Sequence, residues 1–317
     1  MRLFQNASYQ FIEKRRAAYI VSGIALLVGI AAMIFNITSL GSWLRYGVDF
    51  TGGSLVQVQF QDNVSIEELR SALGGVEITR FGEEDLHEFV IRAPLDEETS
   101  ITAVAEAIEA QVGANLPGQA FEVVRTELVG AKVGSELEQK AFLAIMFSFA
   151  LTLMYLAVRF ELRFGLAAVI ATAHDILITL GFLALFRVEI ALPTVAAILT
   201  ILGYSLNDTI IVFDRIRENM GLKGARKRDP VELVNQSINE TLPRTVLTSG
   251  TTLAVLFALL ILGGAVIRDF TIVLILGVLI GTYSSIFVAS PALIEIQKRW
   301  GVGESGEKKK RPEPATV

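Results

Sequence analysis

The chain has 317 residues, of which 52% are hydrophobic and 19% are charged, and it contains no cysteine. Soluble globular chains carry about 25% charged residues, so this composition argues against a purely soluble protein and against a disordered one. The lack of cysteine excludes disulfides, thiolate metal sites and a cysteine nucleophile. Two histidines leave little material for an imidazole metal site, and we expect no metal and no other cofactor.

The net charge of −5 is unevenly distributed and gives no indication of nucleic-acid binding. Residues 41–138 hold 18 acidic and 6 basic residues, a net charge of −12. The rest of the chain holds 15 acidic and 22 basic residues, a net charge of +7. Two physical environments therefore share this chain.

A long apolar run follows the basic residues Lys14, Arg15 and Arg16 and extends over Ala17–Leu44. A secretory signal peptide also begins with basic residues, but its apolar region is shorter and ends at a small-residue cleavage site. We therefore predict that residues 1–40 are a cytoplasmic N-terminus and an uncleaved membrane-spanning helix.

Residues 41–138 are predicted to form an α+β domain outside the membrane. Its expected elements are a strand at Ser54–Phe60, a helix at Ser65–Leu73, strands at Val76–Phe81 and Glu88–Ala93, a helix at Glu98–Val112 and a strand at Ala120–Val129. The order βαββαβ is typical of the ferredoxin-like fold, with an antiparallel four-stranded sheet and two helices on one face. Ser65 and Glu68 have the spacing of a helix capping box.

Five more apolar segments follow, and a bilayer core of about 30 Å requires roughly 20 apolar residues per helix. They are Ala141–Val158, Phe164–Phe186, Ile190–Asn207, Thr245–Ile267 and Phe270–Ile294. The predicted fold class is a polytopic α-helical membrane protein with six transmembrane helices. Residues 139–296 would form a five-helix transmembrane bundle, and residues 297–317 a disordered cytoplasmic tail. Pro230 is expected to start a short amphipathic helix at the membrane surface, with the fifth spanning helix beginning near Pro243.

The distribution of Lys and Arg indicates the orientation of the helices. The N-terminus, the loops after the second and fourth spanning helices and the C-terminal tail together hold 18 basic residues. The two short loops on the other side hold only Arg187 and Arg268. We therefore expect a multi-pass protein with both termini in the cytoplasm and the acidic 41–138 domain outside.

Ionisable side chains inside a membrane are costly and therefore point to function. Asn207 and Asp208 lie in the fourth spanning segment, and Arg244 and Thr248 lie one turn apart at the start of the fifth. An Asp208–Arg244–Thr248 cluster could bind and release a proton or a cation, because the arginine and hydration control the carboxylate. Arg244 could instead extend to the cytoplasmic headgroups.

A second polar pair, His174 and Asp175, lies in the third spanning segment. It is a candidate intramembrane polar pair, and a plain hydrogen-bonded contact between packed helices is the alternative. Gly277 and Gly281 form a Gly-x-x-x-Gly pattern, which favours close helix packing rather than a site.

Four stretches of the sequence resemble the SecF members of the SecD/SecF family, in the resistance-nodulation-division superfamily. They are the glycine-rich Tyr46–Gly53, the Ala-His-Asp of the third spanning helix, Gly203–Glu218 in the fourth and Ser237–Ser249 at the start of the fifth. Together they extend the resemblance over roughly residues 15–297 in the expected order.

The resemblance implies a subunit of the bacterial protein-export machinery in the cytoplasmic (inner) membrane. It implies a heterocomplex with SecD, association with the SecYEG channel and with YidC and YajC, contact with membrane lipid, and a preprotein as substrate. The proton-motive force would drive late translocation through an ion pathway that includes Asp208, Arg244 and Thr248, with Asn207 beside it. Asp49, Gly52 and Gly53 match the family signature and would act as a hinge.

Two alternatives remain. The first is a half-size exporter of small molecules or lipids from the same superfamily, since a shared fold does not fix a function. The second is an intramembrane enzyme that uses His174 and Asp175. No nucleophile accompanies that pair, and the sequence lacks Gly-x-Ser-x-Gly and His-Glu-x-x-His motifs, so we predict that the protein is not an enzyme.

Overall fold

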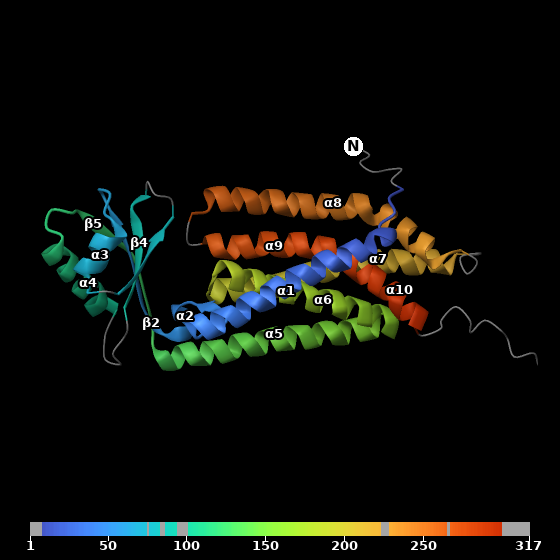
Figure 1. Cartoon of the computed structure of the whole chain (residues 1–317), viewed down its shortest axis with the longest axis horizontal. Coiled ribbons are helices and arrows are strands. Elements are labelled where there is room, and N and C mark those ends of the chain that lie inside the picture. The colour runs from blue at the N-terminus through green and yellow to red at the C-terminus, as the bar shows by residue number, and fades with distance from the viewer. Residues whose placement is uncertain are drawn as a thin grey trace, which may run out of the picture.

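The structure is a computed structural model that describes residues 8–74, 76–82, 86–93, 101–222, 228–264 and 267–299. Within these ranges, six helices are long and apolar enough to cross a membrane, as predicted. They are α1 (Arg15–Leu40), α5 (Ala131–Arg159), α6 (Leu162–Phe186), α7 (Leu192–Gly221), α8 (Pro230–Leu262) and α9 (Arg268–Ser284), which continues through the π-helical turn η5 (Ser285–Ala289) into α10 (Ser290–Arg299). Figure 1 shows them side by side along the long axis, with a small sheet at one end. A 3-10 turn, η1 (Ile12–Lys14), precedes α1.

The stretch from Pro230 to Leu262 differs from its prediction. It forms the single helix α8, with Pro243 in its interior, and not a surface helix followed by a new spanning helix. Proline removes only one hydrogen bond of the helical ladder, here the bond to the carbonyl of Asn239. The side chains of Ile238 and Leu242 just before it are buried in the bundle, and this packing holds the helix together across the proline.

Two other boundaries lie beyond the apolar runs. Helix α5 starts at Ala131, ten residues before its apolar run, with polar first turns, and α7 continues to Gly221. In the predicted tail, residues 297–299 are the end of α10, and residues 300–317 lie outside the described part of the chain.

The sheet region contains all the strands predicted between residues 53 and 129. They are β2 (Gly53–Phe60), β3 (Glu77–Phe81), β4 (Glu88–Ala93) and β5 (Phe121–Val129), with helices α3 (Ile66–Ala72) and α4 (Ile101–Asn115). The strands pair antiparallel in the order β3-β4-β2-β5. The capping box of α3 is present, because Ser65 and Glu68 each accept a hydrogen bond from the other's backbone N–H. Val56, Val58 and Ile91 are buried on the helix-covered side of this sheet.

A second, very small sheet connects this region to the helices. β1 (Arg45–Tyr46), which follows α1, pairs in parallel with β6 (Glu189–Ile190), which lies between α6 and α7. Arg92 of β4 forms an ion pair with Glu189. Three segments therefore meet at Glu189: the strand that follows α1, strand β4 of the sheet region and the strand that follows α6.

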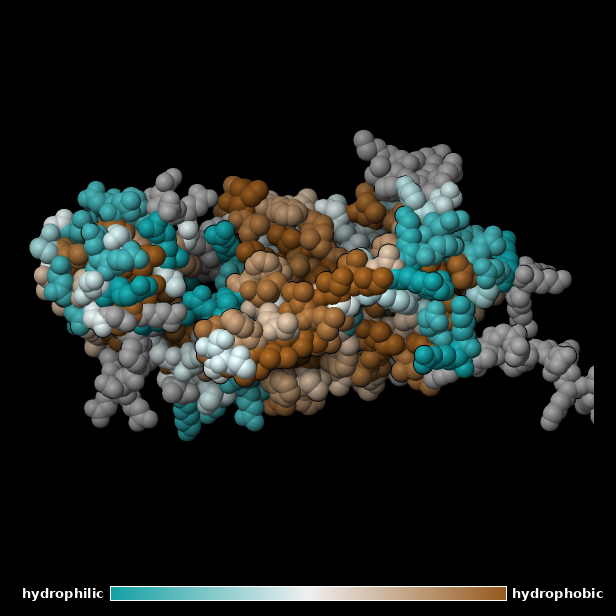
Figure 2. All heavy atoms as spheres, viewed as in Figure 1, coloured by the Kyte–Doolittle hydropathy of each residue, from teal (hydrophilic) through white to brown (hydrophobic). Residues whose placement is uncertain are grey.

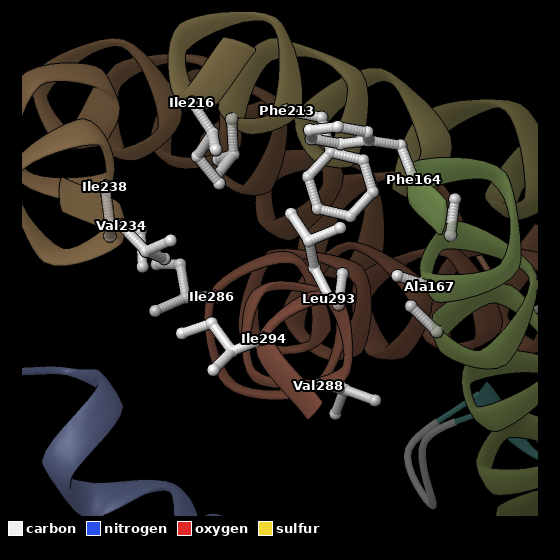
Figure 3. Packing of buried hydrophobic residues seen from close by; sticks show 14 of the residues in the cluster. Phe164, Ala167, Phe213, Ile216, Val234, Ile238, Ile286, Val288, Leu293 and Ile294 are labelled. Atoms are coloured by element: carbon white, nitrogen blue, oxygen red, sulfur yellow. The ribbon is translucent and has the colours of Figure 1, made fainter. Parts of the chain in front are cut away.

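The helix bundle has its largest apolar core at the end away from the sheet. Figure 3 shows Phe164 and Phe213 packed beside Leu293, with side chains from α8 and η5 nearby. The rings of Phe164 and Phe213 meet edge to face with centroids 5.3 Å apart. This core fixes α6, α7 and α10 against one another.

The outer surface of the bundle is apolar over its middle and hydrophilic at both ends (Figure 2). The helices differ in how much of that surface they supply. The spanning windows of α1, α5 and α8 are 17%, 6% and 17% buried, whereas those of α6 and α7 are 44% and 56% buried. α6 and α7 therefore lie inside the bundle, and α1, α5 and α8 present apolar faces to the surroundings.

Candidate functional site

Asp208 lies inside the bundle on α7, and its carboxylate has only one long hydrogen-bonding contact among the described residues. The residue is 1% exposed. Its Oδ2 atom lies 3.5 Å from the hydroxyl of Ser249 on α8, and its Oδ1 atom has no partner in the described part of the chain. An ionised carboxylate without donors is costly in a membrane interior, so this position suits a bound proton or cation.

The polar groups around Asp208 come from three helices. The hydroxyl of Tyr204 on α7 donates to Ser249 over 3.3 Å, and Ser249 lies 2.7 Å from the hydroxyl of Thr282 on α9. The hydrogen of Thr282 goes to the carbonyl of Val278, so Ser249 donates to Thr282 rather than to the more distant Asp208. These hydroxyls therefore leave Oδ2 of Asp208 with only the 3.5 Å contact to Ser249 and Oδ1 with no partner in the described part of the chain.

The hydroxyl of Thr245 on α8 is also buried and has no partner among the described residues. Two unsatisfied polar atoms on neighbouring helices are rare in folded proteins and indicate a place where a proton, an ion or water is accommodated.

The Gly-x-x-x-Gly of α9 brings its helix close to α7. A Cβ on Gly281 would lie 2.9 Å from the Cβ of Ser205.

None of the other predicted ion-pathway residues forms a hydrogen bond with Asp208 in the described part of the chain. Arg244 on α8 is exposed and interacts with Asp208 electrostatically, and no ion pair within 4.0 Å joins the two in the described structure. The hydroxyl of Thr248 donates to the carbonyls of Arg244 and Thr245. Asn207 is exposed, because it points about 100° away from the buried Asp208 around the axis of α7. Tyr204, which lies one turn before Asp208 on α7, and Thr282, which lies on a different helix, α9, were not predicted from the sequence.

His174 and Asp175 form a hydrogen-bonded pair in the middle of α6. Nδ1 of His174 lies 2.8 Å from Oδ1 of Asp175, and both residues are buried. Oδ2 of Asp175 accepts hydrogen bonds from Ser205 of α7 and Ser284 of α9. Nε2 of His174 lies 3.0 Å from the hydroxyl of Ser22 on α1. The pair therefore contacts three other helices, α1, α7 and α9.

The glycine-rich segment after α1 meets two helices where the sheet region joins the bundle. The carboxylate of Asp49 accepts a hydrogen bond of 2.8 Å from the backbone N–H of Leu192, the first residue of α7. Gly52 and Gly53 have φ angles of 70° and 122°, which favour glycine. A Cβ on Gly134 of α5 would lie 2.7 Å from the carbonyl oxygen of Phe50, so this contact also requires glycine.

No group of three or more His, Cys, Asp or Glu side chains that could hold a metal ion occurs in the described ranges. The site chemistry consists of buried carboxylates, one imidazole and hydroxyls.

Comparison with known proteins gives consistent matches. A family model described as "Protein export membrane protein SecD/SecF, C-terminal" matches residues 109–299, and one described as "SecD/SecF GG Motif" matches residues 39–64. The chain is 45% identical to the protein translocase subunit SecF of Gemmatimonas aurantiaca, covering 95% of this chain and 90% of the relative. It is 42% identical to that of Vibrio alginolyticus, covering 90% of this chain and 89% of the relative.

Two solved structures are also similar. One is SecDF of Thermus thermophilus, named as a translocon-associated membrane protein, with a TM-score of 0.79, 37% identity and 94% of this chain covered. The other is SecDF in a super-membrane-facing form, with a TM-score of 0.67, 36% identity and 96% of this chain covered. The chain spans 40% of the length of each of these SecDF chains.

Proposed function

The chain belongs to the SecD/SecF family of protein-export membrane proteins, and we propose that it works as the SecF-type subunit of the Sec translocation machinery. In this role it promotes the late movement of preproteins across the bacterial inner membrane. Its six apolar spans and its membership of the SecD/SecF family support a multi-pass location there.

The chain would act as half of a larger unit whose other half is SecD. The support is its 40% share of the solved SecDF chains and the apolar faces of α1, α5 and α8, which neighbouring helices or lipid would cover. In this proposal SecYEG, YidC and YajC are further partners, and the proton-motive force supplies the energy. A half-size exporter of small molecules or lipids remains the alternative function.

The proposed coupling ion is a proton carried by Asp208, with Arg244, Thr248 and Asn207 along its path. The observation that carries this proposal is the buried Oδ1 of Asp208, which has no partner among the described residues, together with a second unpartnered hydroxyl, that of Thr245, one turn before Ser249 on α8. When Asp208 is ionised, the positive charge of Arg244 attracts it, and when it is protonated, that attraction vanishes. α7 and α8 would therefore have two preferred arrangements, one for each state of the carboxylate.

We further propose that the βαββαβ region is a ferredoxin-like domain on the extracytoplasmic side, with both chain termini in the cytoplasm. The antiparallel strand order β3-β4-β2-β5 and the 18 basic residues of the opposite segments support this placement. Movements of α7 would reach the domain through Asp49, which caps α7, and through the Gly52–Gly53 hinge.

A reconstitution experiment tests the function. Inner-membrane vesicles depleted of their own SecD and SecF-type subunits receive SecD, this chain or both, and completion of preprotein translocation is measured with and without an imposed proton gradient. The proposal expects stimulation only when both subunits and the gradient are present. Stimulation without SecD, or stable assembly of the chain with itself in place of SecD, would favour the exporter alternative.

A further inference from the structure

A chain of hydrogen bonds runs from the His174–Asp175 pair to the backbone of α1. Nε2 of His174 lies 3.0 Å from the hydroxyl of Ser22, and that hydroxyl lies 3.2 Å from the hydroxyl of Tyr283 at the end of α9. The hydroxyl of Tyr283 donates over 2.9 Å to the carbonyl of Ala18. α1, α6 and α9 thus meet in one line of polar atoms inside an apolar bundle.

The direction of each hydrogen bond follows from the last one. Tyr283 has one hydroxyl hydrogen, and the carbonyl of Ala18 only accepts, so that hydrogen is used there. Ser22 must then donate to Tyr283 and accept from Nε2 of His174. The network therefore assigns a hydrogen to Nε2 of His174.

A second hydrogen lies on the other side of the imidazole. Nδ1 of His174 and Oδ1 of Asp175 are 2.8 Å apart and share one hydrogen. Oδ2 of Asp175 is already satisfied by the hydroxyls of Ser205 and Ser284. With hydrogens at both positions, His174 and Asp175 together have zero net charge, which is the favourable state for a pair buried in a membrane protein.

We propose that His174 and Asp175 form a second proton-binding site, distinct from Asp208, whose proton fastens α1 to the end of α9. When the pair releases this proton, it becomes a carboxylate beside a neutral imidazole, with a net charge of −1. Nδ1 keeps its hydrogen for Asp175, and Nε2 then accepts from Ser22. The single hydrogen of Tyr283 must serve Ser22 or the carbonyl of Ala18, so one link between α1 and α9 is lost.

The position of α1 makes this loss consequential. α1 contacts α6 at three levels: at the polar pair through Ser22, at the crossing of Gly29 with Gly181, and through Asn36, which donates to the carbonyl of Ala184 over 2.8 Å. Only the first contact involves the proton-binding pair: its hydrogen bond reverses direction when the proton leaves, and one of the two hydrogen bonds from α1 to Tyr283 of α9 is lost. α1 leads directly into the glycine-rich segment and the sheet region. When α1 is held less firmly against α9, the sheet region is therefore also held less firmly against the bundle.

Few other titratable groups face the pair from the elements packed against α6. Tyr283 comes from α9, and Asp208 follows Ser205 by three residues on α7. Among the more distant charges, Arg15 of α1 pairs with Glu295 of α10, and Arg159 of α5 pairs with Asp214 of α7.

The two proton sites share α7 but not their partners. Asp208 contacts Ser249 of α8, whereas Asp175 contacts Ser205 and Ser284. The second site therefore does not rest on the proposed role of Asp208, and each can be tested without the other.

Nitrogen NMR of the full chain, purified with its partner in lipid nanodiscs, tests the proton assignment. The chain has only two histidines, so His87→Asn leaves His174 as the single 15N-labelled imidazole. His87 lies outside the bundle with φ of 49°, a conformation that asparagine tolerates. The spectrum is recorded from about pH 5 to about pH 10, a range that includes the pH at which histidine side chains change charge.

The expected result is a hydrogen on Nε2 at neutral pH that is lost as the pH rises. Asp175→Asn removes the partner that holds the second hydrogen and should abolish this transition. An Nε2 without hydrogen throughout, a hydrogen that never leaves, or an unchanged transition in Asp175→Asn would each overturn the proposal.

The link to α1 has its own measurement. Because the chain has no native cysteine, Ile34→Cys on α1 and Leu279→Cys on α9, both exposed, accept spin labels without further changes. The distance distribution between the labels should widen at the pH at which Nε2 loses its hydrogen. With Tyr283→Phe added, it should be wide at every pH, since both links are absent. A distribution that stays constant in the otherwise unchanged protein while Nε2 loses its hydrogen would refute the role of the proton in holding α1.

Discussion

The crossing of α1 and α6 provides a direct test of how tightly the bundle is packed. A Cβ on Gly29 would lie 2.7 Å from the Cα of Gly181, and a Cβ on Gly181 would lie 2.8 Å from the Cα of Gly29. Two carbon atoms are in favourable contact at about 3.5 Å or more. Gly29→Ala must therefore push the helices apart by roughly 0.8 Å at this point.

The cost of this displacement can be bounded. Overpacking a tight contact destabilises a protein by about 1–3 kcal/mol. Close backbone approach between small residues is what holds spanning helices together, so van der Waals contact along the whole crossing is lost as well. The neighbouring contacts through Ser22 and Asn36 lie on the same face of α1 and would lengthen with it.

The assay is reversible unfolding of the full chain in mixed micelles, with Gly23→Ala as the matched control. Gly23 lies on the same helix, and a Cβ there would have no atom within 4 Å. We expect Gly29→Ala to lower the free energy of unfolding by about 1–3 kcal/mol and Gly23→Ala to stay within about 0.5 kcal/mol of the parent. Equal effects of the two substitutions would show that the crossing is not as close as described.

Two further predictions concern the junction between the sheet region and the bundle. Asp49→Ala removes the acceptor for the first N–H of α7 and should lower the free energy of unfolding by about 1 kcal/mol. Asp49→Asn keeps an acceptor oxygen and should lower it by less. Equal losses in the two variants would contradict the capping role of Asp49. Glu189→Gln weakens the ion pair with Arg92 and should speed hydrogen exchange of the β1–β6 pair about fivefold, corresponding to about 1 kcal/mol. Glu127→Gln, whose ion pair stays within β5, is the control, and an equal effect there would refute the link.

The sequence contained most of the information about the spans, because apolar runs of about 20 residues have few alternatives to a membrane helix. The capping box at Ser65 and Glu68 was likewise predictable, since all its atoms lie within four residues. Pro243 misled the prediction because a helix terminus and a tolerated interior proline look alike in sequence. Burial of the flanking side chains decides between them.

The site was predictable only in part, for a related reason. A buried carboxylate such as Asp208 is visible as a charge within an apolar run, and so are His174 and Asp175. Their partners are not, because Ser249, Thr282 and Ser22 are ordinary polar residues of spanning helices until the helices pack. The direction of hydrogen bonding around His174 depends on atoms from three helices and requires the assembled structure.

Ion uptake by vesicles that contain both subunits tests whether Asp208 carries the coupling proton. Asp208→Asn is compared with Asp214→Asn, an exposed carboxylate on the same helix that is paired with Arg159, while pH and sodium are varied independently. We predict that Asp208→Asn abolishes proton uptake and the stimulation of preprotein movement by a proton gradient, and that Asp214→Asn retains both. Proton uptake in Asp208→Asn equal to that of the parent would contradict it.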